Sequence, residues 1–151
     1  MVMPVKPLSI TRLVVIDTCV LVAAARSHNG VSFKLLSMLP SSDFEIALTV
    51  PLYTEYQAVL TRPEHLPLGL DVDAALGFVR YLASIALLHD VYFLWRPLLR
   101  DPNDDTVLEC AVACGSKLIL THNTKDFRRA ESLSVSAVTP ADFLELIRSQ
   151  P

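Results

Sequence analysis

The chain has 151 residues, of which 52% are hydrophobic and 19% are charged, so we expect one globular domain with a sizeable core rather than a disordered segment. Its mean hydropathy of +0.41 is high, but no apolar run reaches the roughly 20 residues that span a bilayer, which disfavours a transmembrane helix. The formal net charge of −3 disfavours general nucleic-acid binding, because neutralising phosphates requires local lysines and arginines.

Apolar patterning in the first half of the chain predicts strands alternating with helices. The run "RLVVID" ends in an acid and is typical of a buried parallel strand. Pro51 suits the first turn of a helix that starts at Thr49 or Val50. The predicted elements are a strand at 12–17, helices at 18–27 and 30–40, a strand at 44–49, a helix at 50–62, a loop at 62–71 and a helix at 71–88.

The second half continues the same alternation. A β-rich stretch at 89–95 precedes a helix that begins near Asp101 and is terminated by Gly115. After it we predict a strand at 117–121, a loop and short helix at 123–131, a strand at 133–139 and a capped final helix at 139–149. Alternating strands and helices predict a parallel α/β sheet that is covered on both faces.

Acidic residues follow the strands at the positions where such sheets bind ligands. Ligands sit beyond the carboxyl ends of parallel strands, where the strand order reverses. Asp17 ends the first strand, Asp104 opens the helix at 101–115, and Asp126 lies in the loop after the strand at 117–121. Glu55 lies on a helix that itself follows a strand. The order of elements therefore predicts that four acids from distant segments meet at one edge.

Each acid also has a purely structural explanation. Asp17 suits the cap of the helix that follows it, and Glu55 suits a solvated position on an amphipathic helix. Asp101 before Pro102 resembles an N-cap, and Asp104 stands where a capping-box acid would. Asp126 suits a turn. Only their expected convergence distinguishes a site from helix capping.

Carboxylates gathered without histidine or cysteine are the ligands of Mg²⁺ or Mn²⁺. Several such groups repel one another and take up protons unless a cation lies among them. A metal held this way can activate water for attack on phosphorus. The acids therefore indicate metal-assisted phosphodiester hydrolysis.

The three cysteines indicate a reducing compartment. Cys19, Cys110 and Cys114 are odd in number and lie in apolar surroundings, which favours free thiols over disulfides. Cys110 and Cys114 are one helical turn apart, but no CxxC pair or histidine pair accompanies them, so zinc is disfavoured. The N-terminal segment lacks a small-residue cleavage site, and we expect a soluble, cytoplasmic protein with no membrane association.

Four stretches resemble the PIN-domain family of nucleases, which includes the VapC-like toxins of type II toxin–antitoxin pairs. These stretches are "VVIDTCVLVAA", "TVPLYTEYQAVLTRP", "RDPNDDTVLECAVACGSKLILTHNTKDF" and "VTPADFLELI", and the third is most similar to the toxin branch. The resemblance implies one PIN-like domain over 1–151, with a short extension at about 1–10. It also implies an α/β/α sandwich with a mainly parallel sheet and an Mg²⁺- or Mn²⁺-dependent ribonuclease site.

Carried over by position, the resemblance assigns catalysis and metal binding to Asp17, Glu55, Asp104 and Asp126. Many relatives have Asp where this chain has Asn123, which leaves Asp126 as the fourth acid. Asp105 is expected to face solvent. The residues expected to orient the acids or bind their water are Thr18, Asp101, Thr121 and Asn123.

The resemblance also implies partners: an RNA substrate, an antitoxin whose tail covers the acids, and a second copy of the chain. The candidates for RNA contacts are Arg12, Arg62, Arg96, Arg100, Arg128 and Arg129. Two other functions stay open. An inactive PIN-like scaffold would explain Asn123, and "VVID" is similar to the nucleophile strand of haloacid-dehalogenase-like phosphatases. The phosphatase chemistry needs a second Asp two positions later, where this chain has Cys19.

Overall fold

A computed structural model describes residues 12–66, 71–91 and 99–149 of the chain. In chain order its elements are β1 (Arg12–Ile16), α1 (Thr18–Arg26), α2 (Val31–Ser37), β2 (Phe44–Leu48), α3 (Val50–Leu60), η1 (Pro63–His65), α4 (Val72–Ile85), β3 (Leu87–Leu88), α5 (Pro102–Cys114), β4 (Leu118–Leu120), η2 (Thr124–Leu133), β5 (Ser136–Val138) and α6 (Pro140–Arg148), where η denotes a 3₁₀ helix. The predicted extension at 1–10, residues 92–95 of the predicted β-rich stretch and Arg96 lie outside the described residues.

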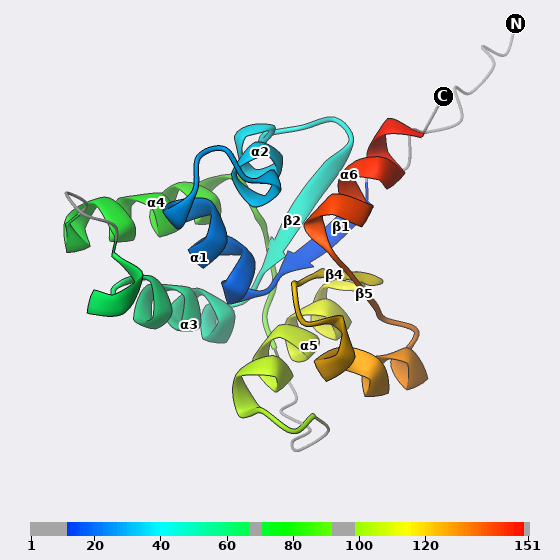
Figure 1. The fold of residues 1–151 in the computed structure, drawn as a ribbon. Helices are drawn as coiled ribbons and strands as arrows, with labels where there is room; N and C mark the ends of the chain where they lie inside the picture. Colours follow the sequence, from blue (N-terminus) through cyan, green and yellow to red (C-terminus); the bar gives the residue numbers. More distant parts are fainter. Residues whose placement is uncertain (1–11, 67–70, 92–98, 150–151) are drawn as a thin grey trace, which may run out of the picture.

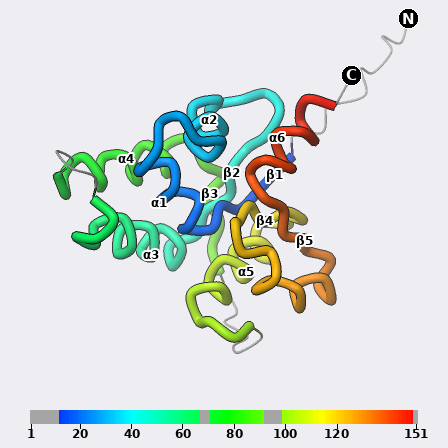
Figure 2. Tube along the Cα trace, in the orientation of Figure 1, coloured from blue at the N-terminus to red at the C-terminus, as the bar shows by residue number. Residues whose placement is uncertain are grey.

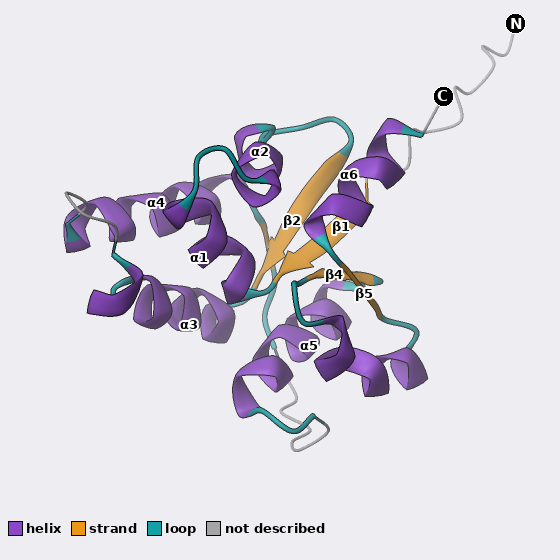
Figure 3. Ribbon diagram, viewed as in Figure 1, coloured by secondary structure: helices purple, strands orange, loops and turns teal. Residues whose placement is uncertain are grey.

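The five strands form one parallel sheet in the order β3-β2-β1-β4-β5. Helices cover both faces of it, which confirms the predicted α/β/α sandwich (Figure 3). Helix α5 packs against β1, β2 and β4, and η2 lies beside it. On the opposite face α2 packs between α1 and α6 (Figure 1). Because the chain runs first to one side of β1 and then to the other, β1 lies at the centre.

The central strand is buried because its sequence is apolar on both faces. Val14, Val15 and Ile16 are each at most 1% exposed, as expected for a strand covered by helices on both sides. Tyr56 of α3 is also buried and donates its hydroxyl hydrogen to the Ile16 carbonyl. This bond satisfies the polar tip of an otherwise apolar side chain and fixes α3 against the end of β1.

The predicted helix at 71–88 is too long at its carboxyl end. Helix α4 ends at Ile85, and Leu87–Leu88 pair with Ala47–Leu48 as the edge strand β3 (Figure 2). Both leucines are exposed, Leu88 to 64%. They extend the apolar pattern of the helix in the sequence, but their side chains do not belong to the core. The strand β3 therefore lies just before the β-rich stretch predicted at 89–95, whose described residues 89–91 are not in a strand.

Side-chain caps explain where several helices start. Thr49, Asp71 and Thr139 each accept a hydrogen bond from a backbone amide in the first turn of α3, α4 and α6. Asp101 does the same for α5, as its sequence predicts, by accepting from the Asn103 amide at 2.9 Å. Helix α5 ends at Gly115, whose φ of +73° falls in the left-handed region that favours glycine.

The expectation that Asp105 faces solvent is wrong. Its side chain is only 3% exposed and accepts a hydrogen bond from the Leu99 amide at 2.9 Å. In the first turn of α5, a side chain at this position points back over the segment that enters the helix. The carboxylate therefore fixes the chain just before the helix start, together with the Asp101 cap.

Replacing Asp105 with Ala is expected to lower the free energy of unfolding by about 1–3 kcal/mol, because the buried Leu99 amide loses its acceptor. Chemical denaturation monitored by circular dichroism measures the change. Asp73→Ala is the control, since Asp73 is an exposed first-turn acid of α4 and should change stability by less than about 0.5 kcal/mol. Equal effects of the two variants would contradict the structural role.

Candidate functional site

Asp17 lies where the strand order reverses. The chain leaves β1 toward β2 and returns later to β4 on the other side, so the carboxyl ends of β1 and β4 form the switch point of the sheet. The Asp17 amide donates to the Leu120 carbonyl at 2.9 Å, which extends the β1–β4 pairing by one residue. The side chain is 6% exposed. The backbone of Asp17 is therefore fixed by the sheet, at the edge where ligands bind in such folds.

The Asp17 carboxylate does not cap α1, although Asp17 is the residue before the helix and its side chain could do so. Its Oδ2 instead accepts hydrogen bonds from the Thr121 hydroxyl at 2.8 Å and the Cys19 thiol at 3.4 Å. The Thr18 hydroxyl lies 3.5 Å from Oδ1, the limit of a hydrogen bond. Capping, the structural explanation for Asp17, is thus excluded by its geometry.

Asp104 lies in the electric field of the other acids. Its pKa is raised to about 7, first by burial and then by the negative charges of four other carboxylates, in the order Asp17, Asp101, Asp126 and Asp105. The side chain of Asp104 accepts no hydrogen bond from any described residue, so it does not complete a capping box. The fold therefore brings Asp17, Asp104 and Asp126 close enough to interact, although they are far apart in sequence.

The loop after β4 carries the remaining polar groups. The Asn123 amide donates to the Thr121 hydroxyl oxygen at 3.0 Å, and the Asp126 amide donates to the Asn123 carbonyl at 3.0 Å. Both side chains are exposed. The loop thus places Asp126 at the open rim of the site, whereas Thr121, which is fully buried, connects the loop to Asp17.

Glu55 does not occupy a solvated position. Its Oε1 atom is buried and has no hydrogen-bond partner in the structure. The neighbouring Tyr56 reaches the Ile16 carbonyl, which brings this turn of α3 to the residue before Asp17. Burial and the charge of Asp17 raise the pKa of Tyr56, so Tyr56 stays neutral. Glu55 is not among the charges that shift the pKa of Asp104.

The predicted acids have the oxygen donors that a divalent cation prefers, but they do not form a complete coordination shell in the structure. A buried carboxylate oxygen without a partner and a carboxyl group with a strongly raised pKa are both stabilised by a nearby positive charge. Among the described ranges, however, no three His, Cys, Asp or Glu side chains are close enough together to hold a metal ion. The acids therefore match a divalent ion in the chemistry of their oxygen donors, while the described residues form no complete coordination shell.

Sequence reasoning missed two residues that contact the Asp17 region. Cys19 and Tyr56 both bond to groups at the end of β1. The available signal for Cys19 was its spacing, two residues after the strand-ending acid and within the same turn. Tyr56 gave no such signal, since a tyrosine on an apolar helix face is typical of any core.

The cysteines are free, as expected. A hydrogen bond between the thiols of Cys110 and Cys114 raises the pKa of Cys110 and lowers that of Cys114. Burial, followed by the charge of Asp17, raises the pKa of Cys19 to about 11. Within the described residues, none of the three belongs to a group of three or more side chains that could hold a metal ion.

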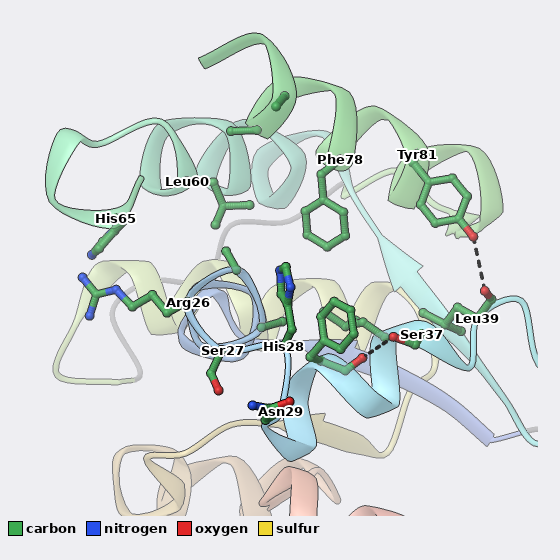
Figure 4. A pocket seen from close by; sticks show the side chains of 16 residues that line it. Arg26, Ser27, His28, Asn29, Ser37, Leu39, Leu60, His65, Phe78 and Tyr81 are labelled. Atoms are coloured by element: carbon green, nitrogen blue, oxygen red, sulfur yellow. Dashed lines mark hydrogen bonds between the residues drawn. The ribbon is translucent and has the colours of Figure 1, made fainter. Parts of the chain in front are cut away.

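A cavity of about 810 Å³ lies away from the acids, between α1 and α2 on one side and α4 on the other. Figure 4 shows Phe78 and His28 pointing into it. Tyr81 bridges one end by donating to the Leu39 carbonyl at 3.2 Å. None of the predicted metal-binding acids lines this cavity, so its walls are a different surface from the acidic edge.

The family model described as "PIN domain" matches residues 13–125 of the chain. The chain belongs to the PIN-domain family. This confirms the resemblance found in the sequence. The match spans β1 to the start of η2. It includes Asp17, Glu55 and Asp104 and ends one residue before Asp126. No curated protein shows detectable sequence similarity to this PIN domain.

Two solved structures share the fold of this PIN domain. A chain of VapBC2 from Rickettsia felis, crystallised with a DNA fragment from the promoter, has 16% identity and a TM-score of 0.59, over 84% of this chain and 98% of that one. A chain of VapBC-1 from nontypeable Haemophilus influenzae has 13% identity and a TM-score of 0.56, over 85% and 98%. At these identities the likeness establishes the fold. Within the described residues no helix is long and apolar enough to cross a membrane.

Asp104→Asn is expected to stabilise the metal-free PIN domain at pH 8. The folded-state pKa of Asp104 is about 7, above its unfolded value of 3.8, so ionisation of Asp104 destabilises the fold as pH rises from about 4 to 7. The asparagine variant avoids this effect. Thermal unfolding in EDTA should show a higher midpoint for the variant at pH 8 and no difference below about pH 4. A less stable variant at pH 8 would contradict the assigned repulsion.

Proposed function

We propose that the protein is a divalent-metal-dependent endoribonuclease and the toxin of a type II toxin–antitoxin pair. The observation that carries this proposal is the mutual field of Asp17, Asp104 and Asp126 at the switch point of a PIN domain. PIN domains are generally nucleases. Repelling carboxylates at a ligand-binding edge lower the stability of the fold unless they serve a cation.

Four acids are proposed to hold Mg²⁺ or Mn²⁺: Asp17, Glu55, Asp104 and Asp126. When bound, such an ion activates water and offsets the negative charge that develops during phosphodiester hydrolysis. Thr121 holds Asp17 through its 2.8 Å hydrogen bond and also accepts from the Asn123 amide. Thr18, Asp101, Thr121 and Asn123 are proposed to orient this set, Asp101 by capping the helix on which Asp104 lies.

Exposed arginines near the acids are proposed to contact the RNA. Arg128 and Arg129 follow Asp126 on η2 and are exposed, as is Arg100 beside Asp101. Arg12 is less suitable. It begins β1 at the amino-terminal edge of the sheet, opposite Asp17, and its Nη1 atom is buried. Because the net charge is −3, these local cations must supply the attraction to phosphate.

The proposed partners are an antitoxin and a second copy of the chain. Both structural neighbours are VapBC proteins, which supports a partner chain. Helices α2 and α4 are apolar and line the 810 Å³ cavity, so they are the proposed partner surface. Three free thiols agree with the proposed cytoplasmic location.

Two alternatives predict different metal behaviour. An inactive PIN-like scaffold would explain Asn123 in place of the family's acid, but it has no reason to bind Mn²⁺. A haloacid-dehalogenase-like phosphatase needs an acid where this chain has Cys19, and the Cys19 thiol instead bonds to Asp17.

Asp17→Asn is expected to reduce metal-dependent RNA cleavage by at least about 100-fold, because it removes a charge from the centre of the site. Cleavage of a mixed RNA pool in Mg²⁺, Mn²⁺ or EDTA, with circular dichroism to verify folding, measures the effect. Asp43→Asn, at an exposed loop acid before β2, is the matched control. Full activity of the Asp17 variant would contradict the mechanism, and absence of Mn²⁺ binding by the wild type would favour the scaffold.

Asn123→Asp should tighten Mn²⁺ binding about three- to tenfold, because it adds a carboxylate at the rim without disturbing the amide that bonds to Thr121. Isothermal titration calorimetry measures the affinity. Asn29→Asp, exposed in the loop between α1 and α2, is the control and should leave binding unchanged. Unchanged or weaker binding by the Asn123 variant would show that the side chain at 123 does not face the ion.

A further inference from the structure

The thiol of Cys19 lies at the centre of the contacts that hold Asp17. It donates to Asp17 Oδ2 at 3.4 Å and accepts from the His122 amide at 3.4 Å. It also touches the Thr121 hydroxyl oxygen at 3.5 Å. One side chain at the start of α1 thus contacts the first acid and two consecutive residues of the loop after β4.

We propose that Cys19 is a positioning residue, whose thiol fixes the orientation of the Asp17 carboxylate and thereby sets the affinity of the site for a divalent cation. This inference rests on the proposed function, because it assumes that a divalent ion binds Asp17. The oxygen assigned to the ion is Oδ1, since Oδ2 accepts hydrogen bonds from Thr121 and Cys19. The proposal gives Cys19 no contact with RNA and no part in the hydrolysis itself.

The two oxygens of Asp17 are occupied unequally. Oδ2 accepts from Thr121 at 2.8 Å and from Cys19 at 3.4 Å, so both of its lone pairs have protein donors. Since the hydrogens of both donors point to Oδ2, the 3.5 Å approach between Cys19 and Thr121 is a packing contact. Oδ1 has only the 3.5 Å approach of Thr18. The carboxylate is therefore locked with Oδ1 directed away from β4, as the oxygen that can face a cation.

Sulfur suits this position better than oxygen because its hydrogen bonds are longer. A hydroxyl needs hydrogen-bond partners at about 2.8 Å, whereas the three polar groups around Cys19 lie 3.4–3.5 Å from Sγ. A serine at position 19 would reach one of them well but not all three together. Alanine would reach none and would leave Oδ2 with Thr121 alone.

The same thiol also ties the loop after β4 to α1. The His122 amide bonds to Cys19, and the His122 ring lies 3.2 Å from the Ser32 hydroxyl of α2. Ser32 is buried, 3% exposed. His122 is thus fixed from two helices, which holds the loop that carries Asn123 and leads to Asp126. Loss of the Cys19 contact would loosen the loop as well as the carboxylate.

Infrared spectroscopy of the metal-free protein tests the thiol–carboxylate bond directly. The difference between wild type and Cys19→Ala isolates the S–H stretching band of Cys19 from those of the other cysteines. Donation to a carboxylate places this band below the frequency of a free thiol, and Asp17→Asn should raise it because an amide oxygen is a weaker acceptor. A band at the free-thiol frequency, or one that Asp17→Asn leaves unmoved, overturns the proposal.

Calorimetric titration with Mn²⁺ alone tests the consequence for the ion. Cys19→Ala should bind Mn²⁺ about five- to tenfold more weakly than wild type, and Cys19→Ser should recover part of the loss. Cys114→Ala, which removes a half-buried thiol from α5, is the control and should bind normally. Unfolding in EDTA verifies that each variant folds.

The outcomes separate this inference from the proposed function. Wild-type affinity in a folded Cys19→Ala variant overturns the positioning role while the nuclease proposal stands. If the wild type itself binds no Mn²⁺, the metal-dependent function fails together with the ion-affinity part of this inference. The infrared band then decides whether Cys19 orients the Asp17 carboxylate. Partial recovery by serine is expected for a hydrogen-bond donor, and the infrared band separates this role from space filling, because a thiol that only fills space would absorb at the free-thiol frequency.

Discussion

The pairing of β1 with β4 is the constraint on which the rest of the molecule depends. These strands are far apart in sequence, yet Ile16 pairs with Leu120, and the Asp17 amide and side chain continue that contact to Leu120 and Thr121. The pairing creates the switch point, since the chain departs from β1 in one direction and returns on its other side. The position of the first acid thus follows from sheet topology, independently of any ligand.

The acidic edge is electrostatically unfavourable in the absence of a cation. Asp104 is half-buried, and four neighbouring carboxyl groups raise its pKa along with burial. The neighbouring Asp105, by contrast, accepts a hydrogen bond from the buried Leu99 amide. Asp105 thus stabilises the fold through a hydrogen bond, whereas the side chain of the adjacent Asp104 is held near other carboxylates and accepts none from the described residues. Strain of this kind is typical of functional sites.

Helix α5 combines structural and site acids within one turn. Asp101 caps it, Asp105 fixes its entry segment, and Asp104 between them interacts electrostatically with Asp17 and Asp126. Successive residues on a helix point in directions about 100° apart. Acids that are close together in the sequence can therefore face different parts of the structure. The N-terminal end of the helix dipole also favours negative charge here and moderates the repulsion.

Sequence by itself determined the parallel α/β class and the order of the elements, because hydrophobic periodicity and caps such as Thr49 and Asp101 are local signals. It also indicated four candidate acids, whose shared role at one site stays a prediction. It did not determine where α4 ends, since Leu87 and Leu88 fit either a helix or a strand. Only the tertiary structure decided which acids serve the fold and which meet at the edge. Asp104 and Asp105 are adjacent and chemically identical, so their opposite roles depend on what the folded chain places around each. For the same reason the contact of Cys19 with His122 exists only once β1 and β4 have paired, because a hydrogen bond between distant segments leaves no pattern in the sequence.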